Sequence, residues 1–175
     1  MSEVLDKIKE RRSIRKFKDT PVPRELLEQI AEAGTYAATS MGKQSPIMIV
    51  VTNKELRDKL SHMNAKIMGR EEDFDPFYGA PNVIVVLSKK SVPAHVYDGS
   101  LVMGNLMLAA YDLGLGSCWI HRARETFETE EGKKILEDLG ITGDYEGIGN
   151  CVIGYQDCET PRAAKRKTGY IHFAE

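Results

Sequence analysis

Four cationic side chains and one hydroxyl lie within seven residues near the amino end, in the run Arg11-Arg12-Ser13-Ile14-Arg15-Lys16-Phe17. Guanidinium and ammonium groups, together with a serine hydroxyl, can surround a phosphomonoester with short, charge-assisted hydrogen bonds. The alternative is a basic surface that simply faces water, which is the commoner role of a short charge run. Phosphate binding therefore needs support from elsewhere in the chain.

Two other polar segments offer that support. A second basic cluster, residues 162–167, lies at the opposite end of the chain, and both clusters could converge on one anion. A charged terminus is otherwise usually a solvated tail. The loop from Thr39 to Pro46 leads into an apolar run, and the amide of Gln44 can donate and accept hydrogen bonds toward a planar heterocycle. Its alternative is an ordinary connection between a helix and a strand.

Other common catalytic signatures are missing from the sequence. It contains no Gly-x-Ser-x-Gly elbow, no His-Glu-x-x-His, no P-loop and no cysteine pair at metal-ligand spacing. Gly114-Leu115-Gly116 fits a helix stop better than a dinucleotide fingerprint, because that fingerprint opens a helix and has a third glycine. The four histidines are scattered along the chain. We therefore predict no metal site.

Composition limits the class of protein. The chain has 175 residues, 42% hydrophobic and 29% charged, which predicts one globular domain over residues 1–175. A net charge of -2 argues against a general nucleic-acid binder. Three cysteines form no disulfide framework, and no run resembles an export signal or a membrane span. We expect a cytoplasmic protein with no nucleic-acid or membrane partner.

Apolar spacing predicts most of the secondary structure. The expected helices are about residues 4–10, 23–34, 54–68, 98–113 and 130–139. The expected strands are residues 46–52, 82–88, 117–120, 149–155 and a short terminal one at 170–173. The first two strands are unbroken β-branched runs, as strands buried on both faces require. A polar stretch at 69–73 predicts a loop, and the fold class is α+β.

The helix at 98–113 is apolar around nearly its whole circumference but too short to cross a bilayer. It must be buried in protein. A chain of this size has little interior in which to wrap such a helix completely. One of its faces is therefore expected to meet a second copy of the chain, as in a homodimer.

The ordered set of these motifs resembles the nitroreductase family of FMN-dependent oxidoreductases. The resemblance rests on the basic run at 11–17, the loop at 39–46, Gly79-Ala80-Pro81, and the segment from Asn105-Leu106 through residues 114–120. Gly154-Tyr155 and the basic tail complete the order. Each motif alone is common, but the ordered set across nearly the whole chain is specific.

The resemblance implies a fold and an activity. The fold would be a central mixed β-sheet flanked by helices, in an intertwined homodimer with FMN at the subunit interface. The cofactor would carry the chemistry, so no catalytic side chain is expected. NADH or NADPH would give hydride to flavin N5, and a nitroaromatic, quinone or similar small acceptor would then take it in a ping-pong cycle.

The same resemblance implies the cofactor contacts. The phosphate, the ribityl chain or the pyrimidine edge of the ring would be held by Arg11, Arg12, Ser13 and Arg15. The phosphate would also meet Lys165 and Lys167, with Arg166 as a possible substitute. The ring would be reached by Asn64 and Gln44, and from the partner subunit by Thr39, Ser40 and Met41. Backbone amides would be offered to flavin N5 at His121 and Arg122.

Two points stay open in this resemblance. Many family members have Pro-Ser in place of Ala38-Thr39 and Asn-x-Gln-Pro-Trp in place of residues 42–46, so the ring contacts of this loop are not fixed. The fold also does not fix the reaction. Reductive dehalogenation, ene reduction, or a flavin-binding sensor with little turnover are alternatives, and a non-flavin anion-binding domain is a more distant one.

Overall fold

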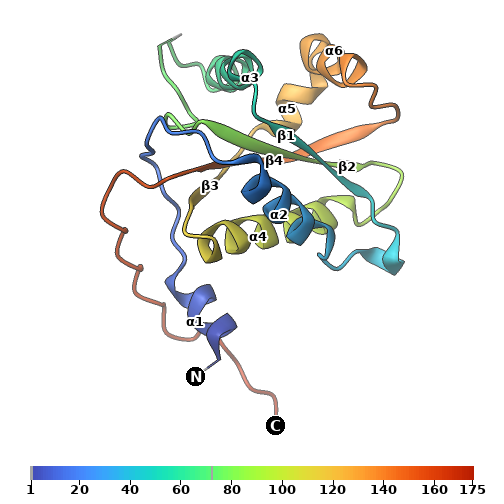
Figure 1. Cartoon of the computed structure of the whole chain (residues 1–175). Helices are drawn as coiled ribbons and strands as arrows, with labels where there is room; N and C mark the ends of the chain where they lie inside the picture. The colour runs from blue at the N-terminus through green and yellow to red at the C-terminus, as the bar shows by residue number, and fades with distance from the viewer. Residues whose placement is uncertain (1, 72) are drawn as a thin grey trace.

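The computed structural model describes residues 2–71 and 73–175 and has one antiparallel sheet in the strand order β1-β2-β4-β3. The strands are β1 (Pro46–Val51), β2 (Asn82–Lys89), β3 (Gly116–Ile120) and β4 (Tyr145–Gly154). Helices α2 (Arg24–Thr35) and α4 (His95–Asp112) cover one face. The other face carries α3 (Lys54–Ile67), α5 (Ala123–Glu128) and α6 (Glu130–Asp138) (Figure 1). The predicted α+β class is confirmed.

The central strand β2 is the most apolar part of the sheet. Its residues from Asn82 to Ser88 are all buried, because helices cover both of its faces. The sequence also predicted that β1 is buried on both faces. That prediction was wrong, because Val50 is 38% exposed and the first three residues of the strand are only half-buried. β1 lies at the sheet edge, where coverage is incomplete.

Alternate residues of β2 enter two separate apolar cores. Val83, Val85 and Leu87 join the cluster under α3, α5 and α6, whereas Ile84 and Val86 join the cluster with α2 and α4. This is the period-two alternation of a strand between two layers. A close approach of α4 to β4 requires Gly99, since a Cβ there would lie 2.5 Å from Ile148 Cγ1.

The predicted helices at 23–34, 54–68, 98–113 and 130–139 are all present, shifted by at most three residues at an end. Gly114, with φ 76°, follows the end of α4, so the predicted helix stop is confirmed. The sequence did not predict α5 or the short 3₁₀ turn η1 (Ser40–Gly42). Part of the loop expected at 69–73 lies outside the described residues. No described helix is long and apolar enough to cross a membrane.

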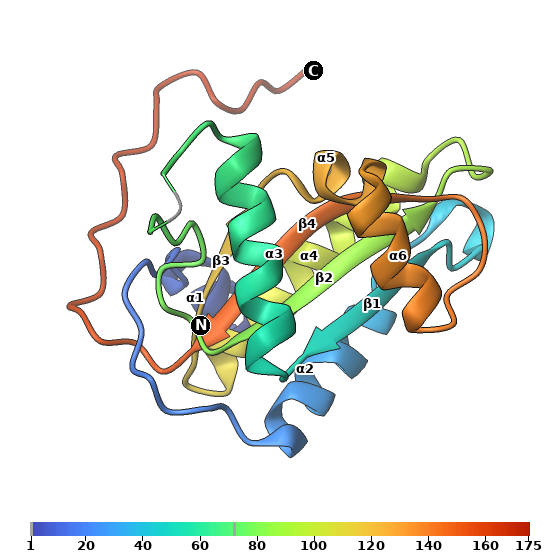
Figure 2. The ribbon, with the colours of Figure 1, turned by 90° about the horizontal axis from the view of Figure 1, so that it is seen from above.

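The two ends of the chain lie outside this sandwich. Helix α1 (Glu3–Glu10) has no buried residue and is tied to α4 by an ion pair of 3.1 Å between Lys7 and Asp112. The tail from 157 is exposed and irregular, and Figure 2 shows it running outside the amino-terminal segment. The strand predicted at 170–173 was wrong, because Ile171 is 74% exposed and the described chain offers this apolar segment no strand partner.

A single isolated bridge adds parallel pairing to the sheet edge. Ser13 pairs with Ser117 of β3, and the Ile14 N–H donates to the Ser117 carbonyl at 3.0 Å. The mixed character expected of the sheet is limited, in the described residues, to this short contact. It fixes the amino-terminal basic run against β3.

Candidate functional site

A pocket of about 550 Å³ opens where the amino-terminal segment meets the tail. Its lining residues come from both ends of the chain: Ile8, Lys9, Arg11, Arg12, Ser13, Ala163, Ala164 and Arg166. Four of these side chains are cationic and none is acidic. The structure therefore brings the two basic clusters together at one site whose potential favours an anion.

One buried cationic atom of a residue that lines this pocket lacks a partner. Arg11 Nη1 is inaccessible to water and meets no acceptor among the described residues. Arg12 Nη1, by contrast, donates to the carbonyls of Lys9 and Arg11, each at 2.6 Å. A buried donor with no acceptor is costly unless a ligand supplies one. The cationic lining of the pocket matches a phosphate group in charge and in hydrogen-bonding capacity.

The local fold explains how the basic run is presented. Ile14 and Phe17 are buried in the core, so the side chains of Arg15 and Lys16 between them face outward. Farther along, the Lys18 N–H donates to the Tyr155 carbonyl at 2.9 Å. These apolar anchors hold the segment across the ends of β3 and β4. Arg15 itself is exposed and does not line the pocket.

The cysteines near this segment are inert. Burial raises the pKa of the Cys118 thiol, an effect that the charge of Arg15 and a hydrogen bond from Ser13 only partly oppose. Burial also raises the pKa of Cys151 to about 12. Both therefore remain thiols near neutral pH and are poor nucleophiles.

The tail presents one of its three neighbouring cations to the pocket. Arg166 lines the wall, and its guanidinium donates to the Ala164 carbonyl at 2.8 Å and 3.1 Å, which bends the tail locally. Lys165 is not among the lining residues. Lys167 lies over the Tyr170 ring, 5.0 Å from its centroid. Of Lys165, Arg166 and Lys167, only Arg166 lines the pocket, and it is therefore the best placed to meet a phosphate there.

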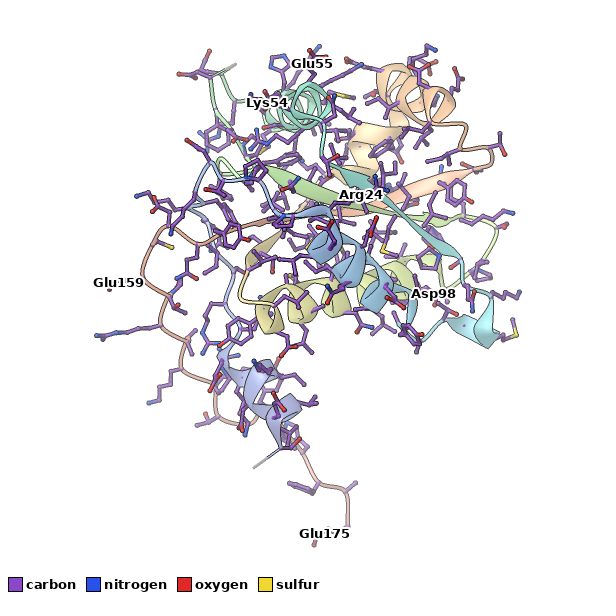
Figure 3. All side chains as sticks on the ribbon, viewed as in Figure 1. Arg24, Lys54, Glu55, Asp98, Glu159 and Glu175 are labelled. Atoms are coloured by element: carbon purple, nitrogen blue, oxygen red, sulfur yellow. The ribbon has the colours of Figure 1, made fainter. Side chains whose placement is uncertain are left out.

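The loop that contains Thr39, Ser40, Met41 and Gln44 is exposed but well anchored. The Ser40 N–H donates to Asp98 Oδ1 at 2.9 Å, and Ser45 Oγ donates to Asp98 Oδ2 at 2.8 Å. Asp98 is only 3% exposed, and Figure 3 places it beside this turn. Sequence reasoning missed Asp98, although an acid within an otherwise apolar helix was a visible signal.

Within one chain this loop does not reach the basic pocket. Figures 1 and 2 both show η1 and α1 at opposite ends of the molecule. The predicted contacts at 39–44 and those at 11–13 are therefore not brought together by the single chain.

A third group of predicted residues meets at the end of β3. Asn64 is fully buried in α3, and its Nδ2 donates to the His121 carbonyl at 2.7 Å. Arg122 follows with φ 74° and precedes α5. The non-glycine residues with positive φ in the described chain are Met41, Gln44, Tyr78 and Arg122. Three of these four were predicted site residues, and such strain is common at functional sites.

The Gly79-Ala80-Pro81 motif has a structural role. Arg57 Nε donates to the Ala80 carbonyl at 2.9 Å, and Arg57 Nη2 lies 2.6 Å from Asp75 Oδ2. The Gly79 N–H also donates to Asp75, at 2.7 Å. Burial raises the pKa of Asp75, but hydrogen bonds from Arg57, Ser61 and Gly79 outweigh it and hold that pKa below its usual value. Sequence reasoning missed this network.

The described residues contain no group of three or more histidine, cysteine or acidic side chains that could hold a metal ion. The features that remain are a cationic pocket, an anchored strained loop and a strained peptide at the end of β3. Together they define an α+β protein with a cationic pocket at the sheet edge.

Comparison with known proteins identifies the family. The model described as "Nitroreductase family" matches residues 8–155, which is most of the chain. This chain therefore belongs to the nitroreductase family, as the resemblance predicted.

Solved structures agree with this assignment. A nitroreductase with bound FMN from Bacteroides fragilis superimposes with a TM-score of 0.89 and 28% identity, covering 100% of each chain. A nitroreductase with bound FMN from Desulfitobacterium hafniense gives a TM-score of 0.88 at 28% identity, again over 100% of each chain. The nitroreductase fold is thus confirmed.

Curated relatives vary in length. An Archaeoglobus fulgidus protein named "Putative NADH dehydrogenase/NAD(P)H nitroreductase" is 33% identical over 89% of this chain and 86% of its own length. The Bacillus subtilis "FMN reductase [NAD(P)H]" is 30% identical over 95% of this chain and 70% of its own. A Methanothermobacter thermautotrophicus relative is 34% identical over 67% of this chain, but the match spans only 60% of that relative.

Proposed function

We propose that this protein is an FMN-dependent oxidoreductase that takes hydride from NADH or NADPH and reduces a nitroaromatic, a quinone or a similar small acceptor. The observation that carries the proposal is the pocket where Arg11, Arg12, Ser13 and Arg166 meet, with Arg11 Nη1 left without an acceptor. The FMN in the Bacteroides fragilis structure and the name of the Bacillus subtilis relative support it.

The cationic pocket would hold the FMN phosphate. Arg11, Arg12 and Arg166 neutralise its charge, and the Ser13 hydroxyl donates one more hydrogen bond. From Ser117, which is bridged to Ser13, the chain runs along β3 and reaches His121 four residues later, a distance of about 13 Å at the rise of an extended strand. The strained peptide at 121–122 would hold the ring. When bound, FMN supplies the hydride chemistry at its N5.

A second copy of the chain would complete the site. Helix α1 has eight residues and buries none of them, and a helix this short is not stable without packing. Its apolar residues Leu5 and Ile8 are 53% and 56% exposed, and Leu101 of α4 is 51% exposed. A hollow of about 480 Å³ lies between α1 and α4. A homodimer that covers this face would bring the partner's 39–44 loop to the cofactor.

The remaining residues would orient reactants and hold charge. Arg15, exposed beside the pocket, would stabilise negative charge that develops on the reduced ring. The buried Asp98 pre-forms the loop at 39–45, so little order is lost when that loop meets the ring. No side-chain nucleophile takes part. Free cysteines at 118, 151 and 158 fit a single domain that works in a reducing cytoplasm.

Purified protein tests the proposal directly. We expect a yellow preparation whose flavin absorbance bleaches anaerobically with NADH or NADPH and returns when an acceptor is added. A panel of nitroaromatics, quinones, halogenated aromatics and enones then identifies the oxidant and separates the reductase from the dehalogenase and ene-reductase alternatives. Yellow protein that neither donor bleaches would point to a binding protein. Colourless protein that takes up no added FMN would refute the proposal.

A matched pair of variants tests the pocket. Arg12→Ala should release FMN on gel filtration, because its guanidinium borders the phosphate pocket. The control is Arg24→Ala, an exposed arginine that pairs with Glu28 at 2.7 Å on α2, outside the pocket lining. Equal flavin occupancy in the two variants would contradict the role given to Arg12.

A further inference from the structure

Two buried asparagines from different elements converge on one backbone carbonyl. Asn64 Nδ2, from α3, donates to the His121 carbonyl oxygen at 2.7 Å. Asn150 Nδ2, from β4, lies 3.5 Å from the same oxygen and 3.5 Å from the Ile120 carbonyl. Asn64 is 0% exposed and Asn150 is 2% exposed. The carbonyl of His121 is therefore held from the protein interior.

This clamp directs the N–H on the other side of the same peptide. The described chain has no cis peptide bond, so the Arg122 N–H points opposite to the His121 carbonyl. Because that carbonyl faces α3 and β4, the N–H faces away from both elements. No acceptor for the Arg122 N–H is found within the described residues. The Arg122 carbonyl, in contrast, accepts from Thr126 N at 3.0 Å and Thr126 Oγ1 at 2.8 Å.

The conformation at Arg122 is strained as well as fixed. A φ of 74° is uncommon for a residue with a side chain and persists only where the surroundings impose it. The surroundings here are the Asn64 and Asn150 amides on one side and the first turn of α5 on the other. A clamped, strained peptide with a free donor is arranged to serve an acceptor outside the chain.

Resting on the proposed FMN site, we propose that Asn64, assisted by Asn150, is a positioning residue that aims the Arg122 N–H at flavin N5 and thereby lowers the reduction potential of the cofactor. Asn64 acts through the 121–122 peptide, because its Nδ2 donates to the His121 carbonyl and the side chain is 0% exposed, so it does not itself reach a ligand. Its role thus differs from the direct ring contact expected from the sequence.

The sign of the effect follows from the chemistry of N5. In the oxidised ring N5 is a hydrogen-bond acceptor. Hydride transfer delivers two electrons and one proton, after which N5 carries a hydrogen and no longer accepts. A fixed N–H at N5 therefore stabilises the oxidised form more than the reduced form. Without the hydrogen bond from Asn64 the 121–122 peptide can rotate. The oxidised form of FMN then loses its preferential stabilisation, and the reduction potential of the cofactor rises.

The test compares midpoint potentials of FMN-loaded variants. Asn64→Leu keeps a similar volume and removes the donor. It should raise the ratio of oxidised to reduced FMN dissociation constants about tenfold, equivalent to a shift of about 30 mV to more positive potential for a two-electron couple. Asn64→Ser, which is too short to reach the carbonyl, serves if the leucine variant does not fold. Asn150→Ala should shift the potential in the same direction by less.

The control removes a comparable buried amide elsewhere. Asn82 is 3% exposed, and its Oδ1 accepts from the Val22 N–H at 3.0 Å. Asn82→Leu should lower thermal stability, as Asn64→Leu does, but should leave the potential unchanged. The Arg122 amide signal in a ¹⁵N spectrum adds a second readout. It should shift when FMN binds to the wild-type chain and lose that shift in Asn64→Leu.

The outcomes separate the two proposals. A wild-type protein that binds no FMN overturns the proposed function, and the tuning role with it. A yellow wild type whose potential and Arg122 signal are unchanged in Asn64→Leu or Asn64→Ser overturns the clamp alone. An equal shift in Asn82→Leu would show a general effect of instability and would also overturn the clamp. A more negative potential in Asn64→Leu would also overturn the clamp, because the N–H would then not act on N5.

Discussion

The sheet sandwich and the two chain ends differ in how their residues are stabilised. In the sandwich, Leu27, Ile84 and Leu106 are fully buried between layers. In α1 no residue is buried, and in the tail Phe173 is 86% exposed. The cationic pocket is lined by residues from both ends of the chain. Figure 1 shows these two ends beside the sandwich. The fold is therefore stabilised in one region, and the proposed anion site lies in the other.

The largest expected contrast is between two leucines. Leu106→Ala in α4 should lower the free energy of unfolding by about 2–5 kcal/mol, because it leaves a cavity in the core. Leu5→Ala in α1, where the side chain is 53% exposed, should change it by about 0.5 kcal/mol or less under conditions that keep the chain monomeric. Denaturant unfolding measures both. Similar losses would show that α1 packs as part of the core.

The next contrast concerns the exposed face of α4. Leu101→Asp would place a charge in the proposed dimer interface, and we expect the dimer dissociation constant to rise at least about tenfold. Leu139→Asp is the matched control, since Leu139 is 48% exposed and follows α6 on the other side of the sheet. Sedimentation measures the change. Dimers of equal strength in both variants would place the interface elsewhere.

A smaller effect is expected within the tail. Arg166→Ala should weaken FMN binding about tenfold, which is the usual cost of one hydrogen bond to a charged group. Lys165→Ala should change it less than about twofold, since Lys165 does not line the pocket and an exposed charge contributes little. Flavin fluorescence titration gives both constants. The reverse order would assign the phosphate contact to Lys165.

The smallest effect is a pH dependence inside the sandwich. The pKa of Asp75 is held below its usual value, so its stabilising contribution is present above the unfolded pKa, about 3.9, and is lost as pH falls through the lower folded pKa. The stability difference between wild type and Asp75→Asn should therefore shrink on acidification below about pH 4. Asp19→Asn, at an exposed carboxylate, is the control. A difference that does not vary with pH would refute the ionic role of Asp75.

The sequence predicted the helices and strands that are determined by residues close together in the chain. The β-branched run of β2 and the glycine after α4 are examples. Helix α5 was missed because it has only six residues and begins after a left-handed Arg122. The apolar residues 170–173 predicted a strand, but strand formation needs a partner edge, which sequence alone cannot supply.

The site was predictable to a similar extent. The sequence showed a basic cluster at each end of the chain and predicted that the two could meet. In the structure, residues from both clusters line one pocket. The bond from Ser40 to Asp98 joins residues 58 apart, and that from Arg57 to Asp75 joins residues 18 apart. Neither pairing has a periodic pattern in the sequence, because each depends on how separate elements dock. The resemblance implied cofactor contacts, which stay a prediction, and it implied neither of these two pairings.

The pocket walled by both termini has a consequence for handling the protein. An anion seated there would act as a clasp between residues 11–13 and 163–166. Removing the anion would free both segments together. Brief proteolysis of the carboxyl-terminal segment should therefore show whether the pocket is occupied, even where flavin absorbance is too weak to measure.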